Sequence, residues 1–100
     1  MPGNKRYEED LMHRRSWSAH EHERRAKGAE RVQYYAEARD EWQAANTSRR
    51  AAAKHAQNAE RQGMAPSALN HEGAINYTQR RSNKNAQLAI EKKAERGRRR

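Results

Sequence analysis

The stretch from residue 29 to residue 62 carries a seven-residue repeat and contains neither proline nor glycine. Two positions of the repeat form a narrow stripe on one side of a helix, aromatic at its start and alanine further on. Arg49 is the charged position within the stripe. The stripe, called the alanine seam below, consists of Tyr35, Ala38, Trp42, Ala45, Ala52, Ala56 and Ala59. The repeat predicts a long central helix with a small-residue face.

Large apolar residues are scarce in the chain as a whole. Leu, Ile, Val and Phe together supply 6 of the 100 residues, whereas alanine supplies 18. Such a composition with a net charge of +9 is typical of chains that cannot bury enough apolar surface to fold alone. Helix-favouring Ala, Glu, Arg, Lys and Gln argue against plain disorder. We therefore expect helices that gain stability by packing on another surface.

Alanine side chains leave no bulk between two helices, so the alanine seam suits a closely approaching backbone. We expect it to dock a helix from a second copy or from another protein, with Tyr35 and Trp42 as anchors. Two alternatives remain open at this point. Residues 68–96 could pack on the seam within the chain, or the seam could be exposed and chosen only for helix propensity.

Local signals divide the chain into four segments. Asn4 is a candidate N-cap for a helix over residues 5–27, in which Tyr7 and Trp17 share the register of the seam aromatics. Acid-before-base pairs four residues apart favour helix: Asp10–Arg14, Glu21–Arg25, Glu23–Lys27 and Glu95–Arg99. We expect an N-terminal amphipathic helix within 1–28, the seam helix in 29–62, a linker turn in 63–67, and a basic helical arm and tail in 68–100.

Glycine, proline and short polar runs mark the expected boundaries. Gly28 predicts a kink or short break, and Asn46-Thr47-Ser48 is the weakest point of the central helix, where a hairpin is the alternative. Gly63 and Pro66 end that helix. Ser67 or Asn70 would cap the next one, residues 82–85 would interrupt it, and Gly97 would end it. The predicted fold is all-α and extended, with one long helix and one or two shorter ones.

Charge is concentrated at the C-terminal end. Residues 80–100 hold nine Lys or Arg against Glu91 and Glu95. Positive charge attracts a phosphate backbone without regard to sequence, and a tyrosine among arginines can stack on an unpaired base. The residues predicted to bind nucleic acid are Tyr77, Arg80, Arg81, Lys84, Lys92, Lys93, Arg96, Arg98, Arg99 and Arg100. A basic tail also suits an acidic protein surface, or serves only solubility.

Enzymatic and metal-dependent functions receive little support. The five histidines are expected on solvated helix surface, because His20 and His22 lie two residues apart and point away from each other on a helix. His71, in Asn70-His71-Glu72, is the remote candidate for a histidine-dependent nuclease. There is no cysteine, phosphate loop or nucleophile elbow. We expect no catalytic residue, no metal and no cofactor.

The sequence contains no secretory leader and no apolar run long enough to cross a membrane, so a cytoplasmic or intravirion location is expected. Its Ala- and Arg-rich style suggests a bacterium of high GC content, its phage or a plasmid. The leading prediction is a non-enzymatic accessory protein that docks on a helical partner, or on itself, and binds DNA or RNA phosphate without base specificity. The alternative is a structural subunit of a larger assembly, such as a phage particle, whose basic arm contacts acidic protein.

Overall fold

The computed structural model describes residues 2–61 and 71–98, which form three helices. Helix α1 spans Pro2–Arg31, α2 spans Tyr35–Arg61 and α3 spans His71–Arg98. The described residues contain no strand, so the all-helical prediction is confirmed. The expectation of one long helix beside shorter ones is wrong in detail, because the three helices contain 30, 27 and 28 residues.

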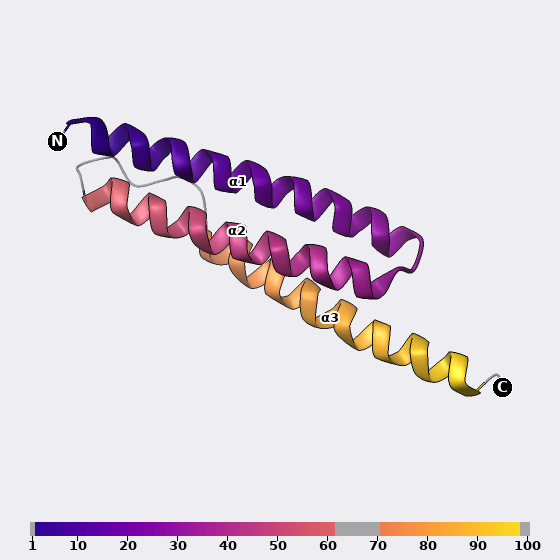
Figure 1. Ribbon diagram of the computed structural model, residues 1–100. Helices are drawn as coiled ribbons and strands as arrows, with labels where there is room; N and C mark the ends of the chain where they lie inside the picture. Colours follow the sequence, from indigo (N-terminus) through magenta and orange to yellow (C-terminus); the bar gives the residue numbers. More distant parts are fainter. Residues whose placement is uncertain (1, 62–70, 99–100) are drawn as a thin grey trace.

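The three helices lie side by side but are shifted along their length, so that their ends do not coincide (Figure 1). Helices α1 and α2 form an antiparallel hairpin, and α3 runs antiparallel to α2 but projects beyond the α1–α2 turn with its C-terminal part. The molecule measures 65 × 17 × 17 Å and has a radius of gyration of 17.0 Å. A compact chain of this length would have a radius of about 13 Å. The predicted extended shape is therefore present.

The buried face of α2 is the alanine seam. Ala38, Ala45, Ala52 and Ala59 are all fully buried. Trp42 packs with Ala26 and Ala38, and Met12 packs with Ala52 and Ala56. The seam is thus covered by helices of its own chain, as in the internal alternative, although α1 supplies most of the cover instead of residues 68–96 alone.

The inward face of α1 does not follow the aromatic register noted in its sequence. Met12, Ala19 and Ala26 are buried at intervals of seven residues, whereas Tyr7 and Trp17 are on the exposed side. The sequence predicted an amphipathic helix here without assigning its buried face, which the structure places on Met12, Ala19 and Ala26. Small side chains of α1 occupy the contact because α2 presents alanines there. Two such faces pack closely without a bulky side chain between them.

Polar side chains form hydrogen bonds and ion pairs between α1 and α2. Arg49 donates two hydrogen bonds to the Glu23 carboxylate, at 3.1 Å from Nε and 2.9 Å from Nη2. His22 Nδ1 lies 2.7 Å from Glu41 Oε2, and His55 Nδ1 lies 2.7 Å from Glu8 Oε2. Glu23 thus reaches across to α2 and not along α1 to Lys27 as expected.

Helix α3 packs on α2 through small polar residues. The amide of Asn46 donates to Ile75 O at 2.9 Å and to Thr78 Oγ1 at 3.1 Å. Ser82 Oγ lies 3.3 Å from Gln43 Oε1. Thr78 and Asn85 are fully buried. Hydrogen bonding of this kind satisfies the polar groups that burial takes from water.

The helix boundaries depart from several local signals. Asn4 lies inside α1 and does not cap it, and α1 continues through Gly28. The break falls at residues 32–34, where Gln33 adopts a φ of 62° and its N–H donates to Glu30 O. The N–H of Tyr34 donates to Ala29 O, which completes a helix-ending motif usually built on glycine.

The remaining polar signals do not interrupt the helices. Helix α2 is continuous through Asn46-Thr47-Ser48, so the hairpin alternative is absent, and α3 is continuous through residues 82–85 and Gly97. Helix α3 begins at His71, the later of the two expected starts. The signals at Gly63, Pro66, Ser67 and Asn70 lie outside the described residues.

Candidate nucleic-acid interface

The predicted nucleic-acid residues fall into two groups in the structure. Arg80, Lys84, Lys93 and Arg96 are exposed, and we call them the exposed cations of α3. Arg81 and Lys92 are half-buried and take part in contacts within the chain. Arg98 is the last residue of α3, but its side chain and both Arg99 and Arg100 lie outside the described part. Of the cations predicted to bind nucleic acid, four are therefore exposed among the described side chains.

Arg81 belongs to a polar cluster where the three helices meet. Its Nη2 pairs with Glu30 Oε2 of α1, and its guanidinium carbon lies 5.6 Å from the Trp42 ring centroid. Asn85 Nδ2 donates to the same Glu30 oxygen at 3.0 Å, and Trp42 Nε1 lies 3.3 Å from Glu30 Oε1. The charge of Arg81 is thus compensated within the protein, so this arginine is a structural residue.

Tyr77 is 43% exposed, and the edge-to-face contact of its ring with Trp42 has a centroid separation of 5.6 Å and an interplanar angle of 88°. Such a contact stabilises the helix pair by itself. Tyr77 therefore packs on the buried aromatic residue of the alanine seam, and only part of its ring is open to a ligand.

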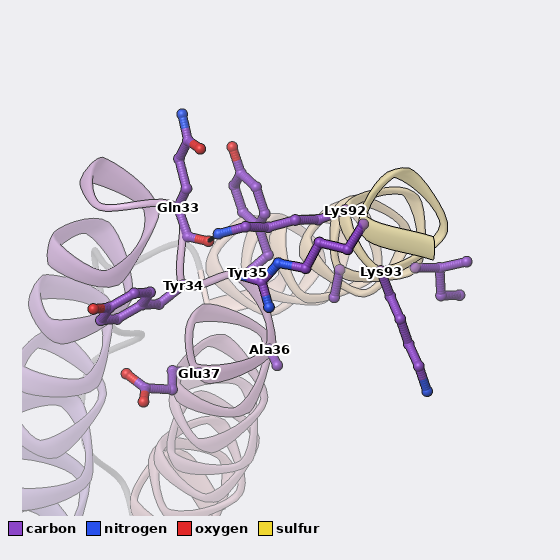
Figure 2. A pocket seen from close by; sticks show the side chains of 10 residues that line it. Gln33, Tyr34, Tyr35, Ala36, Glu37, Lys92 and Lys93 are labelled. Atoms are coloured by element: carbon purple, nitrogen blue, oxygen red, sulfur yellow. Dashed lines mark hydrogen bonds between the residues drawn. The ribbon is translucent and has the colours of Figure 1, made fainter. Parts of the chain in front are cut away.

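Lys92 joins α3 to the turn between α1 and α2. Figure 2 shows its side chain reaching to the Gln33 carbonyl, with 2.7 Å between Nζ and the oxygen, whereas the Lys93 side chain points away from the turn. The same ammonium lies 6.0 Å from the Tyr34 ring centroid and 5.8 Å from that of Tyr35. Lys92 is thus a cation held between two aromatic rings and one carbonyl dipole.

An open groove of about 570 Å³ lies at this corner. We call it the turn groove. Its lining comes from the turn and first residues of α2 on one side and from the projecting part of α3 on the other, as seen in Figure 2. The lining residues are Gln33, Tyr34, Tyr35, Ala36, Glu37, Ala89, Ile90, Lys92, Lys93 and Arg96. The groove is lined by three predicted cations and by two tyrosines that are far away in sequence, and Lys92 lies next to both tyrosine rings.

The sequence prediction missed Tyr34 and Ile90 as parts of this groove. Tyr34 is 57% exposed and Ile90 is 64% exposed. Tyr34 lay outside the seam register, and only the adjacent tyrosine pair at 34–35 gave a local signal. The turn position of that pair could not be read from glycine or proline, because the turn contains neither.

Two large aromatic residues form a second exposed feature, on the outer side of α1. Tyr7 is 61% exposed and Trp17 is 68% exposed. Both lie outside the buried face of α1, which is formed by Met12, Ala19 and Ala26. Aromatic side chains are enriched among the residues that anchor protein interfaces.

His13 and His20 lie on exposed helix surface as expected, whereas the other three histidines are half-buried, which corrects the prediction for them. His22 and His55 pair with glutamates across the α1–α2 contact, and His13 lies 3.8 Å from Glu9 on α1. His71, the remote nuclease candidate, is half-buried at the first residue of α3. Within residues 2–61 and 71–98, no three His, Cys, Asp or Glu side chains are grouped closely enough to hold a metal ion.

No protein-family model matches this chain, and no curated protein or solved structure shows significant similarity to it. Among the described helices, none is long and apolar enough to span a bilayer. The fold and the surface therefore define a class only: a small basic protein whose described residues form three staggered helices.

Proposed function

We propose that this chain is a non-enzymatic accessory protein that binds the phosphate backbone of nucleic acid without base specificity. The observation that carries the proposal is the position of the exposed cations on α3. Arg80 and Lys84 lie on the side away from α2, and Lys93 and Arg96 lie where α3 projects past the turn. Exposed arginine and lysine side chains that neutralise phosphates release the cations condensed on the nucleic acid, and this release favours binding.

Binding measured across a salt series tests this proposal. With about five phosphate contacts, the logarithm of the association constant should fall with the logarithm of salt concentration at a slope near −4. Replacing Arg80, Lys84, Lys93 and Arg96 together by glutamine should reduce the slope by roughly 0.9 for each duplex phosphate that the variant no longer neutralises.

The matched control removes the same charge from α1. Arg14, Arg15, Arg25 and Lys27 are exposed, so their joint replacement by glutamine changes net charge equally. We expect the control variant to retain the wild-type slope, apart from a small uniform decrease in long-range attraction. Equal slopes for the α1 and α3 variants would contradict a binding role for α3.

The second candidate is a structural subunit of a larger assembly, and the exposed Tyr7 and Trp17 favour it. Because α1 and α3 cover the alanine seam, this candidate places partner contact on the outer side of α1. It predicts no affinity for nucleic acid at moderate salt. Self-association, measured by light scattering over a concentration series, should then weaken in Trp17→Ala.

A further inference from the structure

We infer that the turn groove receives an unpaired base together with its phosphate, so that the protein prefers single-stranded nucleic acid to duplex. The inference rests on the proposed function, because it assumes that nucleic acid is the ligand. It adds a location, in residues 33–37 and 89–96, and a ligand form.

The face of α3 that contacts α2 carries small polar residues while α2 lies beneath it. Thr78, Ser82 and Asn85 are buried there. Beyond the first residue of α2, the same helical face continues with Ala89, Lys92 and Arg96. Positive side chains replace small ones where the supporting helix ends. Burying these cations against an apolar helix would cost hydration energy, so a negatively charged ligand suits this face better than an apolar one.

The tyrosine rings on the other side of the groove offer a stacking surface for a base, which a phosphate alone would not use. Tyr34 is more than half exposed, and the Lys92 ammonium lies about equally far from the Tyr34 and Tyr35 ring centroids, at 6.0 and 5.8 Å. Single-stranded nucleic-acid sites combine a cationic track with aromatic rings on which bases stack. The groove volume of about 570 Å³ falls within the range of ligand sites.

An acidic protein segment fits the same surface less well. Glu37 also lines the groove and repels any anionic group placed beside it, whether a carboxylate or a phosphate. The same carboxylate accepts hydrogen bonds, which the ring N–H groups of thymine and guanine and the amino groups of other bases donate. A peptide of aspartate and glutamate side chains donates such bonds only from its backbone. A peptide of aspartate and glutamate also offers no flat ring to Tyr34. Duplex nucleic acid keeps its bases stacked internally and would use only the cations.

The test compares three probes by fluorescence anisotropy at one salt concentration: a labelled oligothymidylate of about twelve nucleotides, a duplex of the same length, and polyglutamate. The variants are Tyr34→Ala, Tyr34→Phe and the control Tyr7→Ala, which removes an equally exposed tyrosine from α1. Circular dichroism verifies that each variant retains wild-type helicity.

We expect Tyr34→Ala to weaken oligothymidylate binding by roughly 5- to 150-fold, the range that one stacked base contributes. Tyr34→Phe should retain the wild-type affinity for oligothymidylate, because the ring stacks without the hydroxyl. Binding of the duplex should change little in either variant. Equal affinity for single strand and duplex, unaltered by Tyr34→Ala, would overturn the groove assignment and leave phosphate binding by α3 standing. Binding of polyglutamate alone would overturn both.

Discussion

Gly28 lies in the middle of the last turns of α1, although glycine is the poorest helix former after proline. A methyl group built on its α-carbon meets no atom within 4 Å. We expect Gly28→Ala to raise the free energy of unfolding by about 1 kcal/mol, because alanine restricts the unfolded chain and clashes with nothing. Urea denaturation followed by circular dichroism measures the change.

Gly97 supplies the control for that substitution. It is equally open, but it lies one residue before the end of α3. Because helix ends fray, Gly97→Ala should stabilise the protein much less. A decrease in stability in Gly28→Ala would show that the chain bends at this position, as the sequence alone suggested.

Single residues also show where sequence reasoning stopped. The sequence predicts Trp42 as an anchor for a partner helix, whereas in the structure this side chain is fully buried by helices of its own chain. Arg81 was predicted on the nucleic-acid surface, yet Glu30 turns it inward from 51 positions away. Such a pairing depends on the stagger of α3 against α1, and no local pattern encodes that stagger. Gln33 was missed as a turn residue because its left-handed conformation normally calls for glycine or asparagine.

At the scale of helices, the seven-residue spacing of alanine identified the inner face of α2 correctly. The same method failed on α1, because the buried face there alternates alanine with charged residues such as Glu23 and reads as polar. Glu23 is compensated by Arg49 across the contact. Pairing between helices hides an inner face from any hydrophobicity pattern, and α3, with Thr78, Ser82 and Asn85 inside, is a second example.

The close contact between α1 and α2 leaves no room for a larger side chain. Ala52 is fully buried beside Met12. We expect Ala52→Leu to reduce the free energy of unfolding by about 1–3 kcal/mol, since overpacking displaces the helices. Ala94→Leu is the control, because Ala94 is exposed on α3 and leucine is nearly as good a helix former. Thermal and urea unfolding should separate the two variants, and equal stability would contradict close packing along the seam.

At the scale of the whole molecule, the interior consists mainly of alanine, with Met12 and Trp42 as the large buried apolar side chains of the described residues. We therefore expect modest stability in isolation, and a rise in helicity or melting temperature when oligothymidylate is added. Ligand at about 100 times its dissociation constant adds roughly 2.7 kcal/mol. Far-UV circular dichroism at several protein concentrations, with and without ligand, measures both effects.

Two results would contradict modest stability of the isolated monomer or its increase on adding oligothymidylate. A dilute monomer that melts sharply at high temperature without ligand would show that polar contacts such as Asn46 with Thr78 supply what apolar burial does not. Helicity that increases with protein concentration alone would favour the assembly subunit, with contact through the outer side of α1.

The alanine-lined contact between α1 and α2 has a thermodynamic consequence. Unfolding it hydrates methyl groups and paired polar side chains, and few hydrocarbon chains. Newly hydrated apolar area increases the heat capacity, whereas polar area decreases it. The heat-capacity increment should therefore fall below the roughly 12–15 cal/mol/K per residue of ordinary globular proteins. The curve of free energy against temperature is then shallow, so warming and cooling over the physiological range alter the folded fraction only gradually.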